Sequence, residues 1–154
     1  MSGKIMATVI VLATVIFGAF LWYFQTRAYY EPVVALSALP VTLADGTVIP
    51  LDVTDFEGID AETSPLRFRA CFSVAPESAA RVLAGGRPAE DAAPLIAPGW
   101  FDCYDAFALG ADIETGAAQA IRATPEIARG VDRIIALYPD GRGFAWHQLN
   151  GTLE

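Results

Sequence analysis

The 154-residue chain is short of the side chains on which most enzymes depend. It has one histidine, His147, and one lysine, Lys4, and its two methionines, Met1 and Met6, lie at the N-terminal end. A Ser-His-Asp triad would have to be built on His147 alone, and no G-x-S-x-G segment is present to supply the nucleophile. A metal site needs several converging N, S or O ligands, which this inventory does not supply. We therefore expect no catalytic residue, no metal site and no cofactor, and a protein that is not an enzyme.

The chain also lacks the motifs that bind nucleotides or haem, namely G-x-G-x-x-G, the Walker A loop and C-x-x-C-H. Asp102 and Asp105 stand close together, but residues three apart on a strand face opposite sides, so on the predicted strand they cannot act as paired carboxylates. We expect Asp102 to pair with Arg67 or Arg69 on a neighbouring strand. We expect His147 to be a surface or half-buried strand residue.

Positive charge is scarce beyond the first 24 residues. Residues 25–154 contain nine Arg, no Lys and all eighteen Asp and Glu, which gives a net charge of −9. A surface of this sign disfavours nucleic acid and anionic lipid headgroups as partners. Plentiful Ala and Arg beside a single Lys fit a GC-rich bacterial genome. In that setting we expect the glycosylation sequon Asn150-Gly151-Thr152 to be unused.

The most prominent feature that the chain does have is an uncharged, apolar run from Ile5 to Phe24. Twenty helical residues extend about 30 Å, which matches the hydrocarbon core of a bilayer. The alternative is a cleaved signal peptide, whose apolar region usually spans about 7–15 residues and ends at a small-x-small site. Here the run is longer and ends in the bulky stretch 20–24. We therefore predict a retained transmembrane anchor in residues 1–30 and a separate domain in residues 31–154.

Residues that favour the membrane–water interface flank the apolar run at both ends. Lys4 precedes it, and aromatic side chains cluster at its far end: Trp22, Tyr23, Tyr29 and Tyr30. Lys4 and Arg27 balance each other, so that only the terminal amine favours one orientation. We predict a single-pass protein of the bacterial inner membrane with a cytoplasmic N-terminus and a periplasmic domain, so the lipid bilayer is itself a partner.

One face of the predicted anchor helix contains small residues. Gly3, Ala7, Thr14 and Gly18 follow one another at spacings of four, seven and four, and Val11 fills the gap. Small residues at such spacings let a second transmembrane helix approach closely. Two interpretations stay open, which are specific packing against another helix and exposure of this face to lipid.

The two cysteines, Cys71 and Cys103, both lie in the predicted periplasmic domain. An even number of cysteines in an oxidising compartment indicates a disulfide. Two alternatives remain, which are a pair of buried free thiols and a working thiol pair or Cu(I) site. The close C-x-x-C spacing by which redox enzymes lower a thiol pKa is absent.

The domain is predicted to be α+β, with a mostly antiparallel sheet. Alternating apolar residues and turn signals predict strands, as a hairpin over 41–53, single strands over 66–74 and 100–107, and a closing hairpin over 133–149. Proline and glycine positions and a high alanine content predict helices over 76–83 and within 111–128. The remaining acidic or proline-rich segments, 55–65 and 87–98, are predicted to be loops.

Four segments of the chain resemble a family of short single-pass proteins from photosynthetic and denitrifying α-proteobacteria. The segments are Gly3-Lys4-Ile5, Tyr29-Tyr30-Glu31-Pro32, Phe101-Asp102-Cys103-Tyr104-Asp105-Ala106 and Tyr138-Pro139-Asp140-Gly141-Arg142. The resemblance covers nearly the whole chain and implies an inner-membrane location. The family has no settled activity, so no catalytic residue carries over.

These observations leave two main classes of function. The first is a non-catalytic accessory or assembly subunit of an integral inner-membrane complex. An acidic periplasmic surface suits a respiratory complex that receives basic cytochrome c, which makes a cytochrome c oxidase-type complex the expected partner. The second is a thiol-dependent or Cu(I)-handling assembly factor that uses Cys71 and Cys103. A third hypothesis is a substrate-binding or envelope-stress sensor domain.

Overall fold

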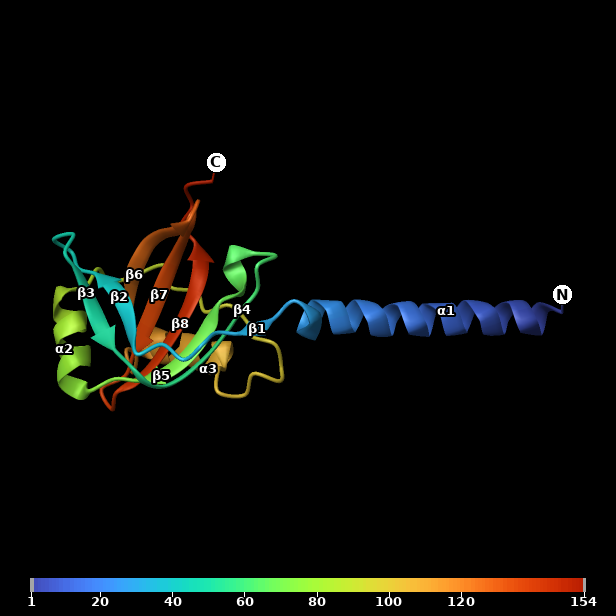
Figure 1. Ribbon diagram of the computed structural model, residues 1–154, viewed down its shortest axis with the longest axis horizontal. Coiled ribbons are helices and arrows are strands. Elements are labelled where there is room, and N and C mark those ends of the chain that lie inside the picture. The colour runs from blue at the N-terminus through green and yellow to red at the C-terminus, as the bar shows by residue number, and fades with distance from the viewer. Residues whose placement is uncertain (1, 154) are drawn as a thin grey trace. The chain divides into compact units, whose positions relative to one another are not determined.

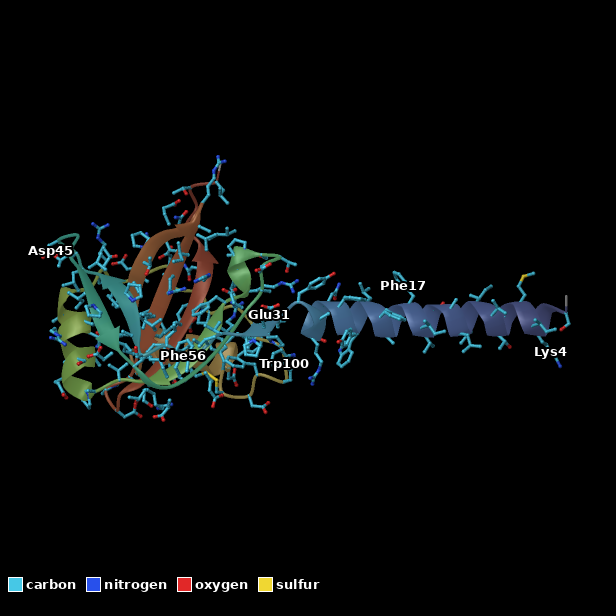
Figure 2. All side chains as sticks on the ribbon, viewed as in Figure 1. Lys4, Phe17, Glu31, Asp45, Phe56 and Trp100 are labelled. Atoms are coloured by element: carbon cyan, nitrogen blue, oxygen red, sulfur yellow. A yellow bond between two sulfur atoms is a disulfide. The ribbon has the colours of Figure 1, made fainter. Side chains whose placement is uncertain are left out.

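The N-terminal segment is one long helix. The computed structural model describes residues 2–153 and divides between Tyr30 and Glu31 into two compact units, which we describe separately. Helix α1 (Gly3–Tyr23) has 21 residues, extends about 31 Å and continues as a π-helical turn over Phe24–Ala28. It is long and apolar enough to cross a membrane, and the protein buries none of its residues. Figure 2 shows apolar side chains such as Phe17 extending from it into open space.

The second unit is built on a six-stranded antiparallel sheet (Figure 1). Its strands, from one edge to the other, are β1 (Glu31–Pro32), β4 (Thr54–Asp60), β5 (Arg69–Ser73), β8 (Arg142–Leu149), β7 (Val131–Leu137) and β6 (Gln119–Ala128). The β7–β8 hairpin lies at residues 131–149, where the sequence predicts it. The prediction of an apolar helix followed by a mostly antiparallel sheet domain is confirmed.

The core lies between one face of this sheet and a smaller layer. That layer is the hairpin of β2 (Ala38–Thr42) and β3 (Val48–Asp52), together with α2 (Pro76–Gly85). The turn of the hairpin is fixed by Asp45, whose carboxylate accepts a 2.8 Å hydrogen bond from the amide of Thr47. The predicted hairpin and the predicted helix over 76–83 are both confirmed.

Alternation along β5 and β8 decides which side chains enter this core. Ala70 and Phe72 of β5 and Ala145 of β8 point into it, while Cys71 and Trp146 point to the opposite face of the sheet. Both faces are covered, so Trp146 is fully buried. The segment that covers the opposite face is the loop after α2, followed by α3 (Ala106–Thr115).

Two sequence-based element predictions are wrong, and a third holds only in part. The acidic segment 55–65 contains most of β4, in which the polar Glu57 is exposed while Gly58 and Ile59 are buried. The predicted strand over 100–107 is instead a turn that leads into α3. Asp105 caps that helix, because its carboxylate accepts from the amides of Phe107 and Ala108 at 2.9 and 3.1 Å.

The alanine-rich segment 111–128 is helical only as far as Thr115. Gly116 ends α3 in the left-handed conformation, with φ 78°. Gln119–Ala128 then forms β6, an edge strand with bulges on either side of Thr124. Ala123 of this strand is fully buried in the core. Packing therefore overrides the helix propensity of the alanines.

Candidate functional site

The predicted helix-packing face lies within the described part of α1. Gly3, Ala7, Val11, Thr14 and Gly18 are all exposed, and a Cβ atom added at Gly3 or Gly18 would meet nothing within 4 Å. The Thr14 hydroxyl donates to the carbonyl of Ile10 at 2.8 Å, so this face presents no free hydroxyl donor from Thr14. The face is thus smooth and available for close approach. Whether another helix occupies it stays a prediction.

The aromatic residues predicted for the interface gather where α1 ends. Tyr23 packs edge-on to Phe24, with ring centroids 5.8 Å apart. The ring of Tyr29 lies at the same centroid distance from Phe24 and is tilted relative to it. Trp22 belongs to the last turn of α1, and Tyr30 follows the helical segment. Lys4 lies at the opposite end of the helix (Figure 2). Such end clusters suit the headgroup region of a bilayer.

Cys71 and Cys103 form a disulfide, as one of the sequence interpretations predicts. Their Cα atoms are 6.3 Å apart and their positions in the chain differ by 32. Cys71 lies in β5 and is 8% exposed, whereas Cys103 is exposed in the covering segment. The bridge therefore fastens that segment to the face of the sheet opposite the main core.

Two buried polar side chains hold the same segment. Arg69 of β5 is 4% exposed, and its guanidinium donates to the carbonyls of Leu95 at 2.7 Å and Ile96 at 3.2 Å. Gln148 of β8 accepts from the amide of Ala93 at 2.9 Å and donates to the carbonyl of Asp91 at 3.1 Å. The proline-rich loop predicted over 87–98 is therefore an ordered cover for the sheet.

This cover presents an exposed apolar surface with an acidic border. Phe107 is 77% exposed and Ile96 is 65% exposed. Two adjoining grooves share Phe107, and the larger has a volume of about 680 Å³. Their lining includes four carboxylates and no lysine or arginine: Glu90, Asp102, Asp105 and Glu114. We call these six residues the Phe107 face.

The structure changes the interpretation of Asp102 and Asp105. Both lie on the Phe107 face, one in a turn and the other at the N-terminus of α3, so the argument that they occupy opposite faces of a strand fails. The guanidinium of Arg69, an expected partner of Asp102, donates to the backbone carbonyls of Leu95 and Leu66. The two acidic residues thus contribute negative charge to an exposed surface.

His147 is only 5% exposed, so the expected surface or half-buried position is wrong. Its Nε2 accepts a 3.1 Å hydrogen bond from Nε of Arg133, which leaves Nδ1 protonated to donate to the Pro65 carbonyl at 2.7 Å. Burial lowers the pKa of His147 to about 4, and the nearby Arg133 and Arg69 act in the same direction. The ring is therefore neutral near pH 7.

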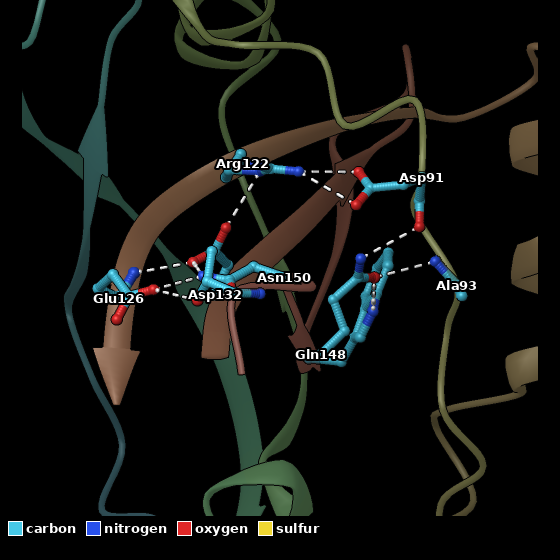
Figure 3. A network of polar contacts seen from close by, with 9 residues as sticks. Asp91, Ala93, Arg122, Glu126, Asp132, Gln148 and Asn150 are labelled. Carbon is cyan, nitrogen blue, oxygen red and sulfur yellow. Dashed lines mark hydrogen bonds and ion pairs between the residues drawn. The ribbon is translucent and has the colours of Figure 1, made fainter. Parts of the chain in front are cut away.

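A polar network that the sequence did not indicate ties the end of β6 to β7 and to the end of β8 (Figure 3). Its centre is Asp132, which is 2% exposed and lies 3.2 Å from Nε of Arg122. Asp132 also accepts from the Glu126 amide at 2.8 Å and from the Asn150 side-chain amide at 2.9 Å. The Asn150 amide that a glycan would need is thus engaged in the fold, and the network has a structural role.

No group of three or more His, Cys, Asp or Glu side chains within residues 2–153 is arranged to hold a metal ion. The sequence model of a family of unknown function, DUF6446, matches residues 39–154, and the chain belongs to that family. Comparison with curated proteins and with solved structures finds no similar chain.

Proposed function

We propose that this protein is a non-catalytic accessory or assembly subunit of an inner-membrane complex. The observation that carries the proposal is the Phe107 face, an exposed apolar surface with an acidic border on a domain that follows a membrane-length helix. Apolar side chains such as Phe107 and Ile96 gain from being covered, because burial of apolar surface contributes about 25 cal/mol per Å². A polar or charged border around an apolar centre is typical of protein interfaces.

The partner that this surface suits has an apolar patch with basic residues around it. Four carboxylates and no basic side chain line the grooves beside Phe107, and the domain as a whole is strongly acidic. Opposite fields would speed the encounter and fix its orientation. A respiratory complex of the cytochrome c oxidase type, which receives a basic cytochrome, is the partner that we name for the test.

The location included in the proposal is the α-proteobacterial inner membrane, with the N-terminus in the cytoplasm and the domain in the periplasm. The disulfide supports this side of the membrane, because such bridges persist in oxidising compartments. A C-terminal fusion to alkaline phosphatase should be active and one to green fluorescent protein should be dark. The reverse pattern would overturn the orientation.

The subunit proposal is tested by purifying tagged full-length protein from its source membrane in mild detergent, followed by native mass spectrometry. We expect a complex with an integral membrane protein, and we expect Phe107→Asp to reduce its recovery at least tenfold. Val48→Asp is the matched control, because Val48 is 61% exposed but lies in β3, outside the Phe107 face. Wild-type protein that elutes alone, or equal losses in both variants, would contradict the proposal.

A thiol-dependent or Cu(I)-handling assembly factor is the second candidate. The observation in its favour is the exposure of Cys103, which leaves one half of the disulfide open to attack by a partner's thiolate. Replacing both cysteines by serine distinguishes the candidates. If the folded double variant still binds the integral membrane protein but the complex no longer becomes active, the thiol role is favoured. If assembly is intact, that role fails.

A further inference from the structure

A second hollow lies elsewhere in the domain, apart from the Phe107 face. It has a volume of about 640 Å³ and is bordered by residues from five strands. Those that matter for the argument are Glu31 from β1, Asp60 from β4, Ile127 from β6, Arg133 from β7 and His147 from β8. Arg133 and His147 are opposite each other in the β7–β8 register, so they are neighbours in the middle of the sheet.

Arg133 is held rigidly at this hollow. Its Nε donates to His147, and its guanidinium carbon lies 4.4 Å from the centre of the Phe68 ring. Phe68 in turn stacks on His147, with ring centroids 4.6 Å apart. Within residues 2–153, neither terminal nitrogen of Arg133 makes a hydrogen bond or an ion pair. The hollow therefore contains a fixed guanidinium fork without an acceptor.

The charge around this fork has the opposite sign. Glu31, Asp60 and Glu62 border the hollow, so its lining has three carboxylates against one guanidinium, while His147 is neutral near pH 7. Asp60 attracts Arg133 through space without forming a direct ion pair with it. Burial raises the pKa of Asp60, and the charges of Arg133 and Arg69 oppose that rise.

These charges select the class of ligand. A simple anion would satisfy Arg133 but would meet three carboxylates, and a simple cation would meet the guanidinium. A molecule with a carboxylate and an ammonium on the same carbon atom can satisfy both. The bidentate geometry of the guanidinium suits a carboxylate in particular.

We propose that the hollow between β1, β4 and β6 binds a free α-amino acid. Its carboxylate pairs with the terminal nitrogens of Arg133, its ammonium lies toward Asp60, and its side chain packs against the apolar wall formed by Pro32, Val33 and Ile127. The site is separate from the Phe107 face, so it can function whether or not the protein has a partner there.

The first test uses full-length wild-type protein in mild detergent and isothermal titration calorimetry at pH 7. The probes are L-leucine, L-phenylalanine and L-arginine. For the leucine shape, 4-methylpentanoate lacks the ammonium and 3-methylbutylamine lacks the carboxylate. We expect saturable binding of at least one amino acid, and at least tenfold weaker binding of both leucine analogues than of L-leucine if leucine binds. Absence of binding by all three amino acids at 10 mM, or equal binding of either analogue, overturns the proposal.

The second test places the site. Arg133→Lys keeps the charge but loses the fork, and Asp60→Asn removes the charge that faces the ammonium. Each substitution should lower the affinity for the bound amino acid at least tenfold. Arg142→Gln is the matched control, because Arg142 also stacks on an aromatic ring, Tyr138 at 4.1 Å, but lies outside the hollow.

The folding of each variant is checked by circular dichroism. If Arg133→Lys does not fold, the Asp60→Asn variant and the analogue series still decide the question. Binding that survives Asp60→Asn unchanged, or that Arg142→Gln weakens equally, refutes the assigned site. Loss of the membrane partner in the Phe107→Asp variant with amino-acid binding intact would show that the two proposals are independent.

Discussion

Removing the disulfide should destabilise the domain of residues 31–154 by an amount that depends on the length of the loop that the bridge closes. The bridge joins Cys71 to Cys103 and so closes a loop of about 33 residues. The chain-entropy relation for a loop of that length gives about 3.7 kcal/mol at 25 °C. The free energy of unfolding of the double variant Cys71→Ala/Cys103→Ala should be lower by that amount. Relaxation of the folded domain without the bridge would make the loss smaller.

Urea unfolding of the full-length protein in mild detergent, followed by tryptophan fluorescence, measures this loss. The buried Trp146 reports on the sheet, while Trp22 belongs to the helix and stays with the micelle. A Trp22→Phe/Trp100→Phe background removes the signals of the helix and of the covering segment and leaves Trp146 as the reporter. Wild-type protein with and without a reductant should show the same difference as the double variant.

The rest of the structure predicts how the loss is distributed. Arg69 and Gln148 still bind the carbonyls and amide of the covering loop after reduction, so the loop should loosen rather than detach. Amide hydrogen exchange should accelerate over residues 87–105 and change little in β7 and β8. A loss below about 1 kcal/mol, or equal acceleration in β7 and β8, would refute this account of the bridge.

Two further predictions concern single residues. His147 has a folded-state pKa of about 4, below its ordinary value of 6.5, because it is buried and neutral. The unfolded chain therefore binds the proton more tightly than the folded one. The contribution of His147 to the free energy of unfolding should be fully present above pH 6.5 and should fall by about 3 kcal/mol as the pH drops to 4. His147→Gln should reduce this slope in urea titrations at each pH, and an unchanged slope would show that other groups cause it. Gly141 has φ 92°, and an added Cβ would lie 2.4 Å from the Val74 carbonyl oxygen. Gly141→Ala should therefore cost about 1–3 kcal/mol, whereas Gly46→Ala, also at positive φ but with open space around it, should cost less.

The parts of the fold that the sequence predicts well are those where local pattern and packing agree. In the strand around Ala70 and Phe72, apolar residues alternate and the structure places them in the core. In the last hairpin, the turn chemistry around Asp140 and Gly141 also fixes the ends of both strands. These elements need no information from distant parts of the chain.

The secondary-structure predictions fail where contacts between residues far apart in the sequence determine the structure. Ala123 is fully buried in the core that the sheet forms with the β2–β3 hairpin, and no local signal in the alanine-rich segment shows this. Residues 100–107 alternate like a strand, yet the cap at Asp105 starts a helix and the disulfide fixes the segment on the sheet. The D-A-F-A sequence that starts at Asp105 was the signal available for that helix.

Part of the proposed amino-acid site follows from the predicted β7–β8 hairpin alone. Arg133 and His147 are each seven residues from Asp140, so a hairpin centred there must place them opposite each other. A buried histidine that accepts from an arginine fixes the direction of the guanidinium, which is the chemical core of the proposal. Asp60, in contrast, lies in β4, within the segment that the sequence predicts to be a loop. The position of the Arg133 guanidinium beside His147 can therefore be predicted from the sequence. The carboxylate that would bind the ligand's ammonium required the sheet order β4-β5-β8-β7, which only the structure provides.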